Sequence, residues 1–169
     1  MKAVMFSVNR PHTDNIKIGA KTSELRTKPP KITGRPYKAY IYETFKNDGC
    51  GKVIGEFVAF NENTYRICMG VPTNLIISGC ISAEEILRYT KNGEKDLTEI
   101  SISDLVIYDK PKELSEFNAI CPNMKPDRTR ENGNCPCGKY THDFDETTGK
   151  TYCTRRKTKP PQSWCYVEP

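Results

Sequence analysis

The composition of this 169-residue chain changes abruptly near residue 121. From Cys121 to about Pro161, small polar residues, proline and charged residues dominate, and aliphatic residues nearly vanish. Such a segment cannot form a core by burial of apolar side chains alone. The apolar pattern returns over residues 161–167, which predicts a closing strand. We therefore expect one domain made of residues 1–118 and 160–169, with residues 119–159 as a cysteine-rich insertion.

The overall composition is that of an ordinary soluble protein, with 36% hydrophobic and 28% charged residues. No run approaches the roughly 18 apolar residues of a membrane span, and the first residues have too short an apolar stretch for a signal peptide. We therefore expect a cytoplasmic protein with no membrane segment. The net charge is +5, with a basic excess at both ends of the chain and an acidic excess in the middle. Such an excess suits phosphate backbones but is also common on soluble surfaces.

Periodicity and turn residues predict a mixture of short strands and helices. Helices are predicted over about residues 13–18, ending before Gly19, and over about 83–91, after the capping box that begins at Ser82. Strands are predicted over residues 2–8, 21–26, 37–42, 52–60, 100–103, 105–108 and 161–167. The strands at 37–42 and 52–60 are expected to form a hairpin.

The predicted strand after Gly19 carries an unusual set of charges. Side chains alternate along a strand, so Glu24 and Arg26 point to the same face, while Lys21 lies at the strand entrance and can bend over either face. Charged groups are costly to bury alone. The segment is therefore either a solvent-facing edge strand or one side of a ligand cleft.

The chain has eight cysteines, which in a reducing cytoplasm are more often thiols or metal ligands than disulfides. Four of them fall in the segment that lacks a core, at Cys121, Cys135, Cys137 and Cys153. A structural Zn2+ held by these thiolates would supply folding free energy that apolar burial cannot. The spacing is irregular, so His142 is an alternative ligand, and free thiols in a mobile loop are the alternative to a zinc site.

Several motifs together resemble one family. They are Gly19-x-Lys21-Thr22-x-Glu24-x-Arg26, Tyr40-Ile41-Tyr42-Glu43, Gly51 to Phe57, Ile102 to Leu105 with Tyr108 to Pro111, and Pro160 to Val167. In order and spacing these resemble the ASCH domain of the PUA-like superfamily, in the form often seen in bacterial and prophage proteins. The resemblance covers residues 1–118 and 160–169, and the segment between them looks like the cysteine-bearing insertion that some of these proteins carry.

The resemblance implies an α+β fold, a small mixed β-barrel with two or three flanking helices, and a cleft near the start of the second strand. In the family this cleft is proposed to bind RNA or a nucleotide. Lys21 and Arg26 suit a phosphate or a base edge, and Trp164 offers a flat face for stacking, with a core or lid residue in the closing strand as the alternative interpretation of Trp164. Glu24 and Glu56 complete the set of candidate ligand-binding residues.

Some ASCH relatives are amidohydrolases that deacylate a modified cytidine with a lysine, a threonine three residues later and a distant glutamate. Lys21 matches the lysine, but Glu24 stands where the threonine is expected, so that nucleophile is missing. If the chain is an enzyme, Glu24 would activate water and Lys21 would hold the oxyanion, with Glu56 as a second carboxylate. We therefore expect an RNA- or nucleotide-binding protein, with a small hydrolase, either a nucleoside amidohydrolase or a ribonuclease, as the alternative.

Overall fold

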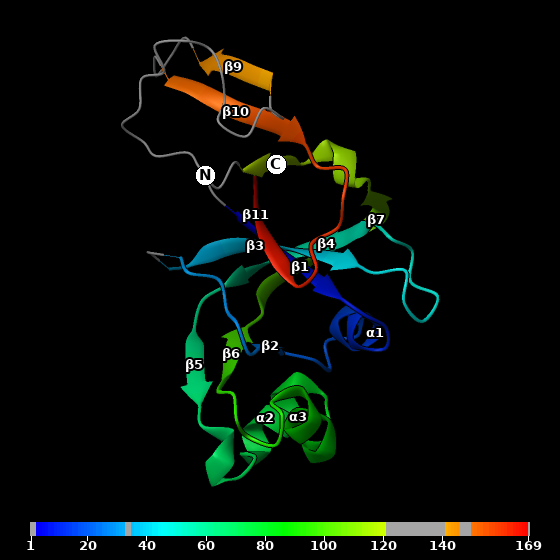
Figure 1. Ribbon diagram of the computed structural model, residues 1–169. Helices are drawn as coiled ribbons and strands as arrows, with labels where there is room; N and C mark the ends of the chain where they lie inside the picture. Colours follow the sequence, from blue (N-terminus) through cyan, green and yellow to red (C-terminus); the bar gives the residue numbers. More distant parts are fainter. Residues whose placement is uncertain (1–2, 33–34, 121–140, 146–149, 169) are drawn as a thin grey trace.

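The computed structural model describes residues 3–32, 35–120, 141–145 and 150–168 of the chain. They form an α+β fold with a large sheet above and a smaller helical part below (Figure 1). The strands are β1 Ala3–Val8, β2 Ser23–Arg26, β3 Tyr37–Glu43, β4 Val53–Ala59, β5 Glu62–Tyr65, β6 Leu97–Ser101, β7 Ser103–Lys112, β8 Asn118–Ile120, β9 Thr141–Asp145, β10 Lys150–Arg156 and β11 Trp164–Glu168. The helices are α1 His12–Lys17, α2 Thr73–Gly79, α3 Ala83–Tyr89 and the 3-10 turns Ile67–Met69 and Leu114–Glu116. None of the helices in these ranges is long and apolar enough to span a membrane.

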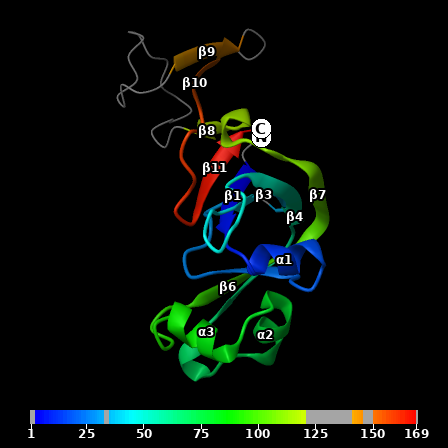
Figure 2. The same ribbon diagram turned by 90° about the vertical axis from the view of Figure 1, so that its right-hand side faces the viewer.

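The large sheet has the strand order β7-β4-β3-β1-β11-β8-β10-β9. Strand β1 pairs in parallel with β3 and antiparallel with β11, where Ala3 lies opposite Val167. The two ends of the described chain therefore lie side by side (Figure 2). The predicted closing strand is confirmed, as is the antiparallel hairpin of β3 and β4.

The described parts of the insertion are more regular than its composition indicates. Strands β9 and β10 pair with each other, and β10 also pairs with β8, which itself pairs with β11. The sheet thus continues into the insertion. Strand pairing uses backbone hydrogen bonds, which almost any residue type can make, so a composition poor in aliphatic residues did not indicate these strands.

The second sheet has only three strands, in the order β2-β6-β5. The predicted α+β class is confirmed, but in the described residues the two sheets of the predicted small mixed β-barrel are not closed into a barrel. The chain passes from the small sheet to the large one at Ile102, whose N–H donates to the carbonyl of Thr22 at 2.9 Å. Within the described residues the strand ladders remain two separate sheets, because β2 pairs with β6 alone.

Apolar side chains gather in three clusters. One covers the face of the large sheet that carries Phe6 and Phe57, whose rings stack at 6.1 Å, and a second covers the opposite face around Tyr40 and Phe117. The third lies between the small sheet and helices α2 and α3. Strand β2 lies where the first and third clusters meet.

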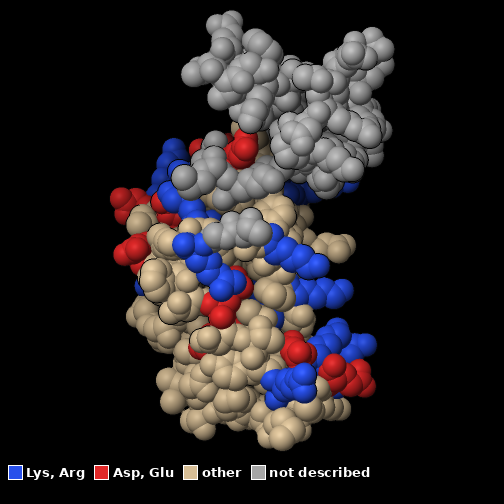
Figure 3. Space-filling view, turned by 90° about the vertical axis from the view of Figure 1, so that its left-hand side faces the viewer, with Lys and Arg blue, Asp and Glu red and all other residues tan. Residues whose placement is uncertain are grey.

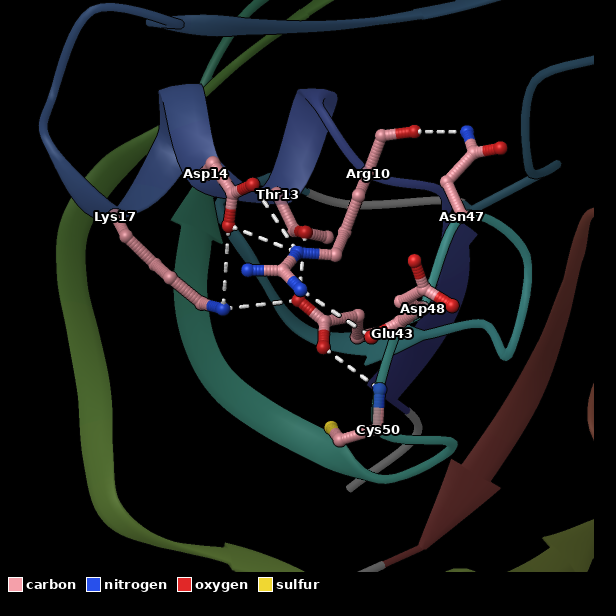
Figure 4. A network of polar contacts seen from close by, with 8 residues as sticks. All are labelled: Arg10, Thr13, Asp14, Lys17, Glu43, Asn47, Asp48 and Cys50. Atoms are coloured by element: carbon pink, nitrogen blue, oxygen red, sulfur yellow. Dashed lines mark hydrogen bonds and ion pairs between the residues drawn. The ribbon is translucent and has the colours of Figure 1, made fainter.

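Helix α1 is fixed to β3 by a buried carboxylate, Glu43, which is 3% exposed (Figure 4). Its Oε1 accepts hydrogen bonds from Thr13 Oγ1 at 2.7 Å and from Lys17 Nζ at 2.9 Å, both on α1. Its Oε2 accepts from the backbone N–H of Cys50 at 2.9 Å. Because α1 leads directly into β2, this network fixes the position of the charged strand.

Candidate functional site

Strand β2 is buried on both of its faces. Leu25 packs in the cluster beneath α2 and α3, whereas Arg26 faces the large sheet, with its guanidinium carbon 5.3 Å from the centroid of the Phe6 ring. The interpretation of this segment as a solvent-facing edge strand is therefore wrong. It pairs along one edge only, but the large sheet and α2 cover its faces.

Three charged side chains meet in this buried position, and we call them the buried triad: Lys21, Glu24 and Arg26, which are 4%, 6% and 7% exposed. Arg26 Nη2 lies 2.8 Å from Glu24 Oε1, and Lys21 Nζ lies 3.5 Å from Glu24 Oε2. Lys21 also donates to the carbonyl of Gly79 at the end of α2, at 3.0 Å. The lysine at the strand entrance thus bends toward the face of Glu24.

Arg26 connects the buried triad to two other parts of the fold. Its Nη2 donates to the carbonyl of Ser7 on β1 at 2.7 Å, and its Nη1 donates to Ser163 Oγ, just before β11, at 3.0 Å. Its buried Nε–H finds no acceptor among the described residues. The guanidinium therefore has a buried nitrogen, Nε, whose N–H is unsatisfied by the described residues.

The buried triad holds two cations and one carboxylate. Burial raises the pKa of Glu24, but the positive charges of Arg26 and Lys21 outweigh this effect, so the pKa lies below its usual value. Glu24 is thus ionised at neutral pH, and the buried triad as a whole carries one excess positive charge.

His12, at the start of α1, belongs to the same electrostatic environment. Burial lowers its pKa below 6.5, and the charge of Lys21 lowers it further, against the weaker opposing effects of Glu24 and Glu85. Its buried Nδ1 has no hydrogen-bond partner among the described residues. The imidazole is therefore neutral at neutral pH, and it interacts with the charges of the buried triad.

A surface depression of about 420 Å³ opens next to Arg26. It is lined by Arg26, Thr27, Lys28, Tyr89, Gln162, Ser163 and Trp164. These residues come from the end of β2 and the segment after it, from the end of α3, and from the start of β11 with the two residues before it. Trp164 Nε1 donates to the carbonyl of Lys28 at 2.7 Å, which ties two sides of the depression together.

The face of the molecule shown in Figure 3 carries no broad stripe of basic side chains among the described residues. Lysine and arginine side chains there lie next to aspartate and glutamate, and the lower part of the face is mostly uncharged. Any attraction for an anion on this side must therefore come from local groups.

The structure brings Lys21, Glu24 and Arg26 together and places Trp164 on the same depression as Arg26. It does not bring Glu56 to them. Glu56 is adjacent to Phe57 on β4 and so points to the other face of the large sheet from Phe6 and Arg26. There it accepts from Lys38 Nζ at 2.7 Å and from the hydroxyl of Tyr108 at 2.5 Å.

The proposed zinc ligands cannot be placed. The structure does not describe the side chains of these residues, which are Cys121, Cys135, Cys137, Cys153 and the alternative ligand His142. Only the backbone of His142, in β9, and of Cys153, in β10, is described. Among the described side chains there is no group of three or more metal-binding residues. The zinc site stays a prediction.

Sequence reasoning missed His12, Tyr89 and Ser163. His12 is one of only two histidines in the chain and lies at a predicted helix boundary, which is a usable signal. Tyr89 and Ser163 gave none, because they join the site only through long-range packing of α3 and of the segment before β11.

No protein-family model matches the sequence, and no curated protein matches it in sequence. Solved structures do match. The crystal structure of ASCH from Zymomonas mobilis has 19% identity and a TM-score of 0.55, over 66% of this chain and 73% of that chain. A tyrosine-to-phenylalanine mutant of that protein has 19% identity and a TM-score of 0.54, over 68% of this chain and 77% of that chain. A serine-to-alanine mutant has 18% identity and a TM-score of 0.53, over 66% of this chain and 74% of that chain. The chain therefore has the fold of the ASCH domain, as its motifs indicate.

Proposed function

We propose that the chain binds a nucleotide, either free or within RNA, in a cleft that consists of the buried triad and the depression next to it. The observation that carries this proposal is the double position of Arg26. It belongs to a buried group of charges with an excess cation, and it also lines a surface depression beside that group.

The charge balance supports an anionic ligand. A buried cation is costly unless an anion compensates it, and Glu24 can neutralise only one of its two neighbours. A phosphate would supply the missing charge, since a guanidinium offers several donors in one plane. Lys28, exposed at the rim of the depression, would add a second contact to the same phosphate.

The position of Trp164 supports a ligand with a flat ring. Its side chain packs partly against the core of the large sheet and also lines the depression. The core role and the binding role are therefore compatible. Bases of single-stranded nucleic acid stack on such rings regardless of sequence, whereas phosphate contacts make binding sensitive to salt.

A direct test uses the intrinsic fluorescence of Trp164, the only tryptophan of the chain. The protein is titrated with a short single-stranded RNA and with a nucleoside monophosphate at two salt concentrations. We expect saturable quenching that weakens with salt, and an affinity at least tenfold lower in Arg26→Met. Arg66→Met, which alters an exposed arginine outside the depression, is the matched control.

The variant Lys28→Ala keeps the test valid if Arg26→Met fails to fold, because the Lys28 side chain is exposed and its loss should not disturb the fold. We expect it to weaken binding severalfold and to leave the thermal midpoint unchanged. Absence of binding by the folded wild-type protein would overturn the proposal, as would equal affinities of wild type, Arg26→Met and Lys28→Ala.

A hydrolase acting on a modified nucleoside or on RNA is a second candidate, and His12 is the observation that favours it. A neutral imidazole whose pKa responds to Lys21 can accept a proton from water. Glu24 is less suited to that role than the sequence indicates, because both of its oxygens face cations and its lowered pKa makes it a weak base. The binding function is therefore better supported.

Turnover distinguishes the two candidates. Labelled RNA and acylated cytidine are incubated with wild type and with Lys21→Ala, and products are separated by chromatography. If wild type forms product and Lys21→Ala does not, the protein is a hydrolase and the binding-only function is wrong. Salt-sensitive binding without product supports the first proposal.

We also propose a reducing, cytoplasmic location. The described part of the chain contains free thiols at Cys50, Cys68, Cys80 and Cys165. Thiols in such number are typical of proteins that stay in a reducing compartment. Alkylation of intact cells followed by mass spectrometry would test this, and oxidised thiols in fresh lysate would contradict it.

A further inference from the structure

Two aromatic side chains from different parts of the fold line the depression beside Arg26. Trp164 is the first residue of β11, and Tyr89 is the last residue of α3. Seventy-five positions separate them in the sequence, so only the folded chain brings them to one site. The proposed nucleotide cleft uses Trp164 but leaves Tyr89 without a role.

Tyr89 ends a well-anchored helix without being part of the core. Its side chain is 42% exposed, which is high for a large aromatic residue at the end of a helix. Three residues earlier, Ile86 is fully buried, and Thr90 Oγ1 donates to the Ile86 carbonyl at 2.8 Å. The capping box of Ser82 and Glu85 fixes the other end of α3. The backbone that carries Tyr89 is thus fixed at both ends of α3, and the exposed ring is available to a ligand in the depression.

Trp164 is fixed in a similar way. Its indole N–H donates to the carbonyl of Lys28 at 2.7 Å, and the Tyr166 ring meets it edge to face with centroids 5.2 Å apart. One part of the indole is therefore anchored on the protein. The part that lines the depression remains available for a ligand.

We propose that Tyr89 and Trp164 together hold one unpaired nucleobase, so that the ligand is a single-stranded RNA or a free nucleotide and not a duplex. This inference rests on the proposed nucleotide-binding function and adds Tyr89 as a binding residue. A volume of about 420 Å³ accommodates a single base with its sugar, at the lower end of ligand pockets. A base within a duplex has both faces covered by its neighbours and cannot reach these rings.

The polar neighbours fit the same placement. Thr27 and Gln162 line the depression beside the two rings and can bond to base edges, while Arg26 and Lys28 serve the phosphate. Aromatic walls with polar groups at the edge bind bases with weak sequence preference. Binding should therefore depend on strand state more than on sequence.

The test measures, by fluorescence anisotropy, the affinity of the protein for labelled RNA. Three probes are compared: a single strand, a duplex, and a three-nucleotide single strand with one abasic position. Variants are Tyr89→Leu, Tyr89→Phe and the control Phe60→Leu, which alters an exposed aromatic residue outside the depression. We expect a loss of roughly tenfold for Tyr89→Leu and near wild-type affinity for Tyr89→Phe and Phe60→Leu. The duplex and the abasic probe should bind wild type at least tenfold more weakly than the intact single strand.

The outcomes separate the two proposals. If wild type binds the single strand and Tyr89→Leu binds it equally well, the role of Tyr89 is overturned and the nucleotide cleft stands. Equal affinity of wild type for duplex and single strand overturns the inference that the bound base is unpaired, and the nucleotide cleft again stands. If folded wild type binds no RNA and no nucleotide, the proposed function fails, and this inference fails with it.

Discussion

Arg26 and Glu24 form an ion pair inside the protein, with 2.8 Å between Nη2 and Oε1 and both side chains more than nine-tenths buried. Charges in this position are normally neutralised completely. Here a second cation, Lys21, shares the same carboxylate at 3.5 Å. The pair therefore organises the site, and its removal should affect both stability and ligand affinity.

Glu24→Gln should be strongly destabilising. It leaves Lys21 and Arg26 buried without a counter-charge, and breaking a buried pair typically costs about 3 kcal/mol or more. Urea unfolding gives the free energy directly. Glu84→Gln, at an exposed position on α3, is the control. A change below about 0.5 kcal/mol for Glu24→Gln would contradict the account.

The network of Glu43 should make stability depend on pH in the acid range. Burial raises the pKa of Glu43, but hydrogen bonds from Lys17, Thr13 and Cys50 outweigh this and lower the pKa from 4.5 to about 2. Because the folded pKa lies below the unfolded one, the stabilisation is present above pH 4.5 and is lost as the pH falls toward 2. Unfolding free energies at pH 5, 4 and 3 should therefore fall more steeply for wild type than for Glu43→Gln. Parallel slopes would argue against a role of this carboxylate.

His12 should titrate below the usual range. Its folded pKa is lowered by burial and by Lys21 and Arg26, so stability should decrease as the pH falls below 6.5, where the unfolded chain binds the proton more readily. The chain has two histidines, and the spectrum of His12→Asn assigns their resonances. NMR titration of the imidazole signals measures the pKa of His12 in the folded protein. A His12 signal that titrates at 6.5 or above would be incompatible with this environment.

The zinc prediction can be checked independently of the cleft. We expect about one equivalent of Zn2+ per chain in protein purified without added metal, and loss of structure on chelation, as in other small structural zinc sites. A paired Cys135→Ser and Cys137→Ser variant should lose the metal, while Cys68→Ser, exposed in the main domain, should keep it. Less than about half an equivalent, with no effect of the chelator, would remove the prediction.

The elements with strong local signals were predictable. The capping box of Ser82 and Glu85, the hairpin of β3 and β4, and the left-handed position of Gly19 after α1 all correspond to the structure. Helix α2 gave no such signal. It has no side-chain cap, and its apolar run contains both the buried Leu75 and the exposed Ile77, so the pattern did not show a helical face.

The site was predictable in part. Alternation along one short strand places Glu24 and Arg26 on the same face. The position of Lys21 does not follow from alternation, because Lys21 precedes β2 and bends toward that face. The burial of these side chains does not follow from it either, because it depends on β2 being enclosed by the large sheet and α2, which are distant in the sequence. The misplacement of Glu56 has the same origin, since the sequence of β4 does not indicate which face of the sheet the Arg26 side chain will cover.

The central claim is that the cleft beside Arg26 binds a nucleotide, and a crystal structure with a bound nucleoside monophosphate tests it most directly. We predict the phosphate within hydrogen-bond distance of the Arg26 guanidinium or Lys28 Nζ, and the base against Trp164. A nucleotide bound elsewhere on the chain, or an empty cleft at a concentration that saturates the protein in solution, would contradict the account.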